Sequence, residues 1–138
     1  MSISRFYEPH KQFFDIALAE IKAGRKQSHW MWYIFPQLKS LGYSSTAVYY
    51  GLENADEAKL FYEDSYLGEN LRVICRALLE CESNDPLEVF GYPDNLKLCS
   101  SMTLFYRATK DELFADVLQK FYGGKQDELT LNQITARN

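Results

Sequence analysis

Apolar residues recur along most of the chain at the three-to-four-residue spacing of an α-helix. The first such stretch covers residues 9–23, where five apolar side chains share one helical face: Phe13, Phe14, Ala17, Leu18 and Ile21. Pro9 suits the first turn of a helix, and Gly24 suits the position just beyond its end. Residues 9–23 are therefore predicted to form the first helix.

The most regular pattern lies near residues 65–82. Its apolar residues form one stripe: Leu67, Leu71, Ile74, Cys75, Leu78 and Leu79. Glu69, Arg72 and Glu80 fall outside the stripe, as expected for a helix with one buried face. This stretch is the clearest helix in the sequence.

Shorter periodic stretches, separated by capping residues and glycines, predict further helices. They cover residues 45–52, 54–62, 85–90, 94–106 and 110–122, with a last turn at 127–134. No heptad pattern persists, which excludes a coiled coil. We therefore expect an all-α fold: one compact domain spanning residues 1–138, with roughly six to eight helices packed at varied angles around a central aromatic segment.

The central segment is the run of six apolar residues at positions 30–35, which holds both tryptophans, Trp30 and Trp32. A segment that is apolar on every side must be covered on every side, so other elements should wrap it. Periodicity cannot separate a buried helix from a buried strand over so few residues. Ser28 suits an N-cap and no alternating partner strand is found, which favours a helix, and Pro36 should end it.

Composition and charge exclude several classes of protein. With 138 residues and a hydrophobic fraction of 46%, the chain is long and apolar enough to bury a core. The net charge is −4 and no basic run occurs, which disfavours nucleic acid as the main partner. The longest apolar run is too short to span a membrane, and the first residues lack the apolar core of a signal peptide. We therefore expect a cytoplasmic protein without a membrane partner.

The cysteines also favour a reducing compartment. Cys75, Cys81 and Cys99 are odd in number and lie within apolar patterns, so we expect reduced, partly buried thiols. Cys75 and Cys81 would lie roughly 9 Å apart along one helix axis, beyond the reach of a disulfide.

Two blocks of the sequence resemble a known family. Residues 24–38 read GRKQSHWMWYIFPQL, and residues 90–105 read FGYPDNLKLCSSMTLF. They are similar to the patterns GRKxSHWMWxxFPQL and FGxPDxxKxxSSMTLF of a bacterial family catalogued as domain of unknown function 1810, sometimes labelled calpastatin-like in genomes. The spacing of the blocks and the segments at 67–71 and 127–131 also fit, so the resemblance covers nearly the whole chain. It implies a compact, mainly helical fold and no established activity.

The first block offers a candidate anion site. Arg25 and Lys26 precede a predicted helix, whose free amides and dipole would add to their charge, and a tryptophan nearby can stack on a planar ring. The candidate ligand-binding residues of this block are Arg25, Lys26, Ser28, Trp30, Trp32 and Gln37. The alternative is structural: the two cations would cap the preceding helix and the tryptophans would belong to the core.

His29 is the candidate general acid or base, because the pKa of histidine lies near neutrality. The alternative is a hydrogen-bonded structural histidine. No cysteine or carboxylate lies at ligand spacing from His29, and His10 is the only other histidine. Zinc needs three or four ligands, so we expect neither a metal nor a cofactor.

The second block places Lys97 three residues before Ser100 and four before Ser101, on one face of a predicted helix. A serine beside a lysine can act as an activated nucleophile, and Arg107 extends the same strip. In the alternative, the hydroxyls bond the backbone and Lys97 points into water. Polar residues in the middle of a packed helix nevertheless favour a polar pocket there.

Three classes of function remain open. The first is a binding module for a small anionic, nucleotide-like metabolite, in which Arg25 and Lys26 lie at the mouth of a pocket floored by Lys97, Ser100 and Ser101. The second is an enzyme acting on such a metabolite through His29 or the pair of Lys97 and Ser100. The third is a protein–protein interaction module without a pocket.

Overall fold

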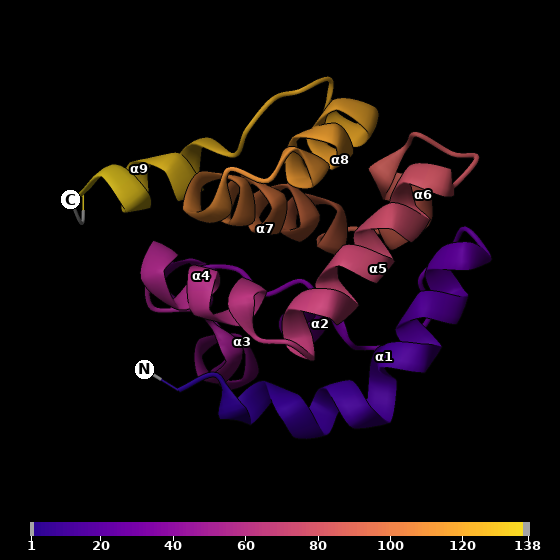
Figure 1. Ribbon diagram of the computed structural model, residues 1–138. Helices are drawn as coiled ribbons and strands as arrows, with labels where there is room; N and C mark the ends of the chain where they lie inside the picture. The colour runs from indigo at the N-terminus through magenta and orange to yellow at the C-terminus, as the bar shows by residue number, and fades with distance from the viewer. Residues whose placement is uncertain (1, 137–138) are drawn as a thin grey trace.

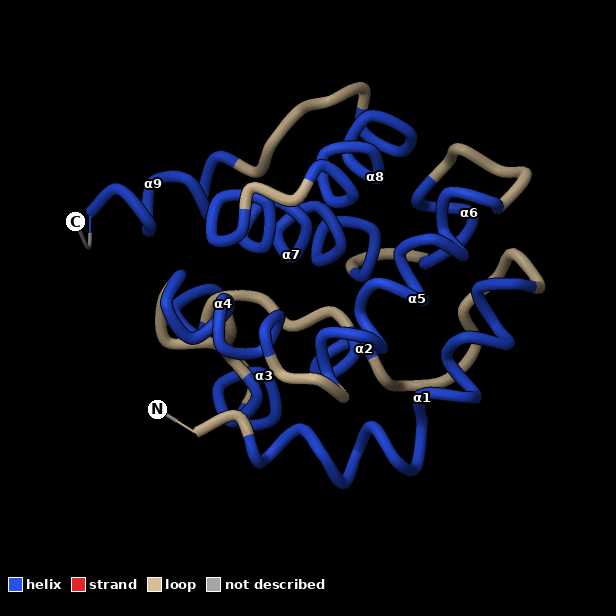
Figure 2. The backbone as a smooth tube through the Cα atoms, in the orientation of Figure 1, coloured by secondary structure: helices blue, strands red, loops and turns tan. Residues whose placement is uncertain are grey.

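The computed structural model describes residues 2–136 and consists of helices joined by short loops (Figures 1 and 2). Its nine α-helices, all within these residues, are α1 (Tyr7–Lys22), α2 (Met31–Ile34), α3 (Ser45–Tyr50), α4 (Ala55–Glu63), α5 (Leu67–Glu80), α6 (Pro86–Phe90), α7 (Asp94–Thr109), α8 (Glu112–Tyr122) and α9 (Glu128–Ala136). Two 3-10 turns are η1 (Ser4–Phe6) and η2 (Lys39–Leu41). The only β pairing in the described part is an isolated bridge between Leu38 and Leu52. The all-α fold is confirmed.

The longer helices pack in pairs around one buried core. Helix α7 contacts α4 and α8, while α5 contacts α1 and α8. The short α2 contacts α1 and α3. No helix of the described residues is both long and apolar enough to cross a membrane.

Side-chain caps explain where several helices begin. Asn54 accepts a hydrogen bond from the Glu57 amide at the start of α4, and Asp111 accepts one from the Leu113 amide at the start of α8. Asp94 is not the cap of α7: it is the first residue of this helix, and its carboxylate contacts lysines instead. This carboxylate therefore connects α7 to Lys26 of the first block.

The aromatic segment is buried with one exception. Trp30 is 0% exposed at the N-cap position of α2, and its ring lies 6.2 Å from that of Phe35 and 6.4 Å from that of Phe90. The helix is a single turn, because Pro36 follows at once. Trp32 is only partly buried, so one tryptophan belongs to the core and the other reaches the surface.

The three cysteines are free thiols. Cys75 is fully buried, with its Sγ 3.8 Å from Met102 Sδ, and the Cys81 thiol donates a hydrogen bond to the Ile21 carbonyl. Burial raises the pKa of all three thiols, Cys99 included. A raised pKa keeps a thiol protonated and unreactive.

His10, on α1, is the buried histidine of the structure. Its Nδ1 lies 3.0 Å from Nδ2 of the Asn70 side chain. This amide nitrogen can only donate, so Nδ1 accepts the hydrogen bond. Its Nε2 therefore carries the proton and donates to the carbonyl of Tyr33 at 2.7 Å. The ring is neutral, and burial lowers its pKa to about 4 despite this carbonyl and the nearby Asp64 carboxylate.

We expect His10 to make the stability of the protein depend on pH. In the unfolded state His10 binds a proton with a pKa near 6.5. The stability that the neutral, buried ring contributes is therefore complete above about pH 6.5 and is lost as the pH falls toward 4. The loss should be on the order of 3 kcal/mol in the free energy of unfolding. Urea denaturation of wild type and His10→Gln at a series of pH values measures it. A difference between the two proteins that stays constant over this range would contradict the prediction.

Candidate functional site

The first sequence block is organised by Glu20, near the end of α1. Its carboxylate accepts hydrogen bonds from the amides of Gln27 (2.8 Å) and Ser28 (2.9 Å), from the Ser28 hydroxyl (2.5 Å) and from Trp30 Nε1 (2.9 Å). Burial alone would raise the pKa of Glu20, but these four bonds outweigh it and lower the pKa to about 2. Ser28 and Trp30 are thus held by Glu20, and Ser28 is not the N-cap that the sequence predicts.

Lys26 joins the two blocks. Its backbone amide donates to the Val89 carbonyl at 2.7 Å, and its ammonium lies 2.6 Å from the Ser28 carbonyl and 2.8 Å from Asp94 Oδ2. The ammonium also lies 5.0 Å from the centre of the Trp30 ring. Lysine has three N–H donors, and the structure supplies a carbonyl, a carboxylate and a π face for them. Lys26 is therefore a structural link between the blocks.

A cavity of about 390 Å³ lies where the two blocks meet. His29 and Trp32 of the first block and Tyr92, Asp94 and Lys97 of the second line it, and we call it the inter-block cavity. The Lys97 ammonium lies 3.5 Å from Asp94 Oδ1 and 5.7 Å from the centre of the Trp32 ring, and its side chain is 27% exposed. Among residues 2–136, only the carboxylate and the ring face contact this ammonium, so Lys97 retains donor capacity that Lys26 lacks.

Other predicted residues of the first block lie elsewhere. Arg25 is exposed and outside the cavity lining, with its backbone amide bonded to the Glu20 carbonyl. Trp30 is buried in the core. Gln37, together with Trp32 and Lys97, lines a separate void of only about 10 Å³. Such a void holds no more than about one water molecule.

The expected floor of Ser100 and Ser101 is not part of the inter-block cavity. The Ser100 hydroxyl lies 3.1 Å from Asp127 Oδ2, at the start of α9, and therefore does not pair with Lys97. Ser101 is fully buried, and its hydroxyl has no hydrogen-bond partner among the described residues. Arg107 donates to Gln126 at 2.9 Å. Ser100 and Arg107 thus contact the segment that leads into α9.

Comparison with known proteins identifies the family of the chain and a similar structure. The model of a family described as "Protein of unknown function (DUF1810)" matches residues 1–134. The chain belongs to this family. No curated protein matches this DUF1810 chain. Its fold is similar to the crystal structure of the conserved hypothetical protein Rv1873 from Mycobacterium tuberculosis, with a TM-score of 0.92 and 40% identity over 95% of this chain and 94% of that one.

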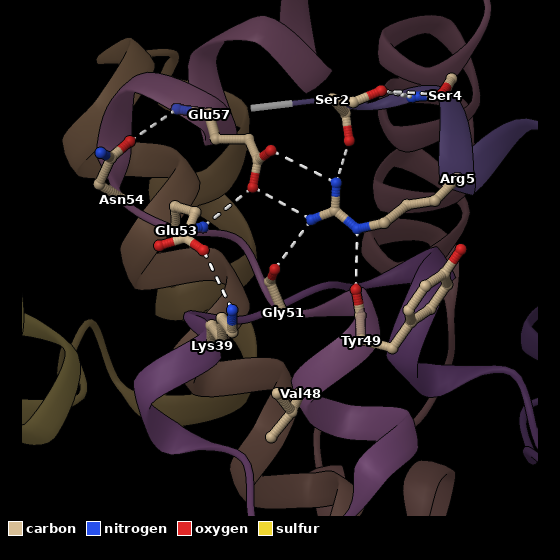
Figure 3. Close-up of a pocket in the computed structure, with 10 residues that line it drawn as sticks. All are labelled: Ser2, Ser4, Arg5, Lys39, Val48, Tyr49, Gly51, Glu53, Asn54 and Glu57. Carbon is tan, nitrogen blue, oxygen red and sulfur yellow. Dashed lines mark hydrogen bonds and ion pairs between the residues drawn. The ribbon is translucent and has the colours of Figure 1, made fainter.

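The DUF1810 chain has a larger cavity, of about 690 Å³, around Arg5 (Figure 3). Arg5 donates to the carbonyls of Tyr49, Ser2 and Gly51, and both of its terminal nitrogens contact the Glu57 carboxylate, as the dashed lines in Figure 3 show. A guanidinium has five N–H donors, and these five contacts use all of them. Arg5 therefore fastens the N-terminal segment to the start of α4 and has no donor left for a ligand.

Two contacts that build this site, those of Glu20 and of Asp94, follow from no pattern in the sequence. Glu20 lies seven to ten positions before its partners, and Asp94 lies far along the chain from Lys26. The partners of Glu20 lie beyond the end of α1, and Asp94 lies in a different element from Lys26, so only the packed structure reveals the contacts. Among the described residues, no three His, Cys, Asp or Glu side chains gather to hold a metal ion.

Proposed function

We propose that this protein binds a small anionic metabolite with a planar ring in the inter-block cavity. The observation that carries the proposal is the pairing of an ammonium with an aromatic ring on one wall: Lys97 Nζ lies 5.7 Å from the centre of the partly exposed Trp32 ring. An anionic group would take the spare donors of Lys97, and the ring of the same ligand would contact Trp32.

The rest of the lining supports this assignment. Tyr92 is 77% exposed and offers a second aromatic surface, and His29 adds a polar side chain at the rim. The volume of about 390 Å³ falls at the lower end of the roughly 300–1,000 Å³ of small-molecule pockets. The cavity therefore suits a ligand of one or two rings rather than a polymer.

A thermal-shift screen of aromatic carboxylates and phosphates tests the proposal on three proteins: wild type, Lys97→Met and Lys59→Met. A ligand present at a hundredfold excess over its dissociation constant should stabilise wild type by about 2.7 kcal/mol. Lys97→Met keeps the apolar stem beside Trp32 but removes the charge, so it should bind the ligand at least about tenfold more weakly. Its unliganded stability should change by no more than about 1 kcal/mol, because the Lys97 ammonium is partly exposed and makes a long ion pair and a distant ring contact.

Lys59→Met is the matched control, because Lys59 is an exposed lysine on α4 away from the cavity lining. It should bind every ligand as wild type does. Equal affinity of wild type and Lys97→Met for the ligands that bind would place binding at another site and refute the proposal.

A further inference from the structure

Resting on the proposed function, we propose further that the inter-block cavity selects a compact aromatic monoanion and that Asp94 excludes dianions such as phosphate monoesters. The specificity of the site then depends on a residue of the same charge as the ligand. Asp94 is the first residue of α7 and lines the cavity between the two lysines.

The charges at the cavity support one unit of negative charge on the ligand. Lys26 and Lys97 supply two positive charges, and Asp94 supplies one negative charge. Lys26 is only 7% exposed and its donors are already engaged, so it neutralises Asp94 rather than a ligand. The ammonium of Lys97 is then the one cationic group of the lining that remains for the ligand.

The position of Asp94 sets the penalty for a second negative charge. Its Oδ1 lies 3.5 Å from Lys97 Nζ, so any anion bound to Lys97 also lies close to this carboxylate. A single anionic group on the ligand binds the Lys97 ammonium. It can lie beside the Asp94 carboxylate, because the ligand group and Asp94 contact the same cation. A second negative charge on the ligand has no further cation to pair with and is repelled by Asp94 at short range. This repulsion offsets much of the binding free energy that the contact with Lys97 provides. A phosphate monoester carries about −1.5 to −2 at pH 7, whereas a carboxylate carries one charge.

Size leads to the same class of ligand. The cavity of about 390 Å³ equals the liquid volume of about thirteen water molecules at roughly 30 Å³ each. A one- or two-ring carboxylate fits within such a space. The favoured ligand thus places a ring against Trp32 and a single carboxylate, or another singly charged group, on Lys97.

A matched series of naphthalene derivatives tests the charge selectivity by isothermal titration calorimetry at pH 7.5. The probes are 2-naphthoate (one charge), 2-naphthamide (none), and naphthalene-2,3-dicarboxylate and 2-naphthyl phosphate (two charges at one end of the ring). Wild type should bind 2-naphthoate at least about tenfold more tightly than each of the others. In Asp94→Asn the preference for 2-naphthoate over the two dianions should shrink at least about threefold, because the repelling charge is gone.

A second variant makes the test independent of how well Asp94→Asn folds. Lys97→Met should lose the preference for 2-naphthoate over 2-naphthamide, since the cation that favours the carboxylate is absent and Asp94 remains. If wild type binds a dianion as tightly as 2-naphthoate, and this binding is lost in Lys97→Met, the monoanion inference is overturned while the proposed site survives. If wild type binds none of the four probes, the proposed function and the inference both fail.

Discussion

Replacing Trp30 by alanine is expected to lower the free energy of unfolding by about 3–5 kcal/mol. The ring is 0% exposed and packs against Phe35 and Phe90, so its removal leaves a cavity in the centre of the fold. The loss includes a hydrogen bond, because the indole Nε1 donates to Glu20 at 2.9 Å. Urea denaturation monitored by far-ultraviolet circular dichroism measures the change.

Trp32→Ala is the comparison variant, since Trp32 has the same side chain two positions away but is only partly buried. Its cost should be clearly smaller than that of Trp30→Ala, because part of its surface already faces water. Trp30→Phe retains most of the side-chain volume but loses the hydrogen bond to Glu20. Its loss of stability should lie between those of Trp32→Ala and Trp30→Ala. Equal losses of stability for both alanine variants would contradict the assignment of Trp30 to the core and Trp32 to the cavity wall.

Glu57→Ala is expected to destabilise the protein by about 3–5 kcal/mol, because it breaks a buried ion pair from one side. The Glu57 side chain is 1% exposed, and its Oε1 lies 3.1 Å from Arg5 Nη2. The same oxygen accepts the Glu53 amide at 2.9 Å. Without the carboxylate, the guanidinium at the centre of Figure 3 loses its counterion while its side chain is only 16% exposed. Guanidinium-chloride or urea denaturation of the two proteins gives the difference.

Glu53→Ala provides the matched control in the same cavity. Its side chain pairs with Lys39 at 3.2 Å, but both side chains are more than two-fifths exposed. Exposed ion pairs contribute at most about 1 kcal/mol, so Glu53→Ala should change stability by no more than that. Should Glu53→Ala cost as much as Glu57→Ala, burial would not be what gives the Arg5 contact its strength.

Local sequence patterns predict the helices of this chain well, because each helix depends on residues that are close together in sequence. The helical spacing of Phe13 to Ile21 predicts α1, and Gly24, with φ +84°, lies just past its end as expected. The burial of Trp30 also follows from the sequence, since six consecutive apolar residues must be covered. Both inferences need only the chemistry of a single segment.

The candidate site is less predictable because it depends on which elements face each other. Ser100 and Thr103 lie in the middle of α7, which suggests a polar pocket there. The structure gives these residues another role: the Ser100 hydroxyl contacts the Asp127 carboxylate, and the Thr103 hydroxyl accepts the Asp127 amide at 2.9 Å. A helical pattern identifies a polar face but does not identify its neighbour. The sequence nevertheless identified Lys26 and Lys97 as residues from two blocks that meet.

The link between Lys26 and Asp94 has a consequence for the order of events during folding. The two residues are 68 positions apart, so their contact closes a long loop whose entropic cost one ion pair does not repay. The intervening helices must first dock and bring the blocks together. A chain that has collapsed and formed its helices, but has not yet closed this contact, therefore has no inter-block cavity. Competence to bind would appear only at the final stage of folding, so ligand capture by a refolding chain should lag behind the recovery of its helical signal.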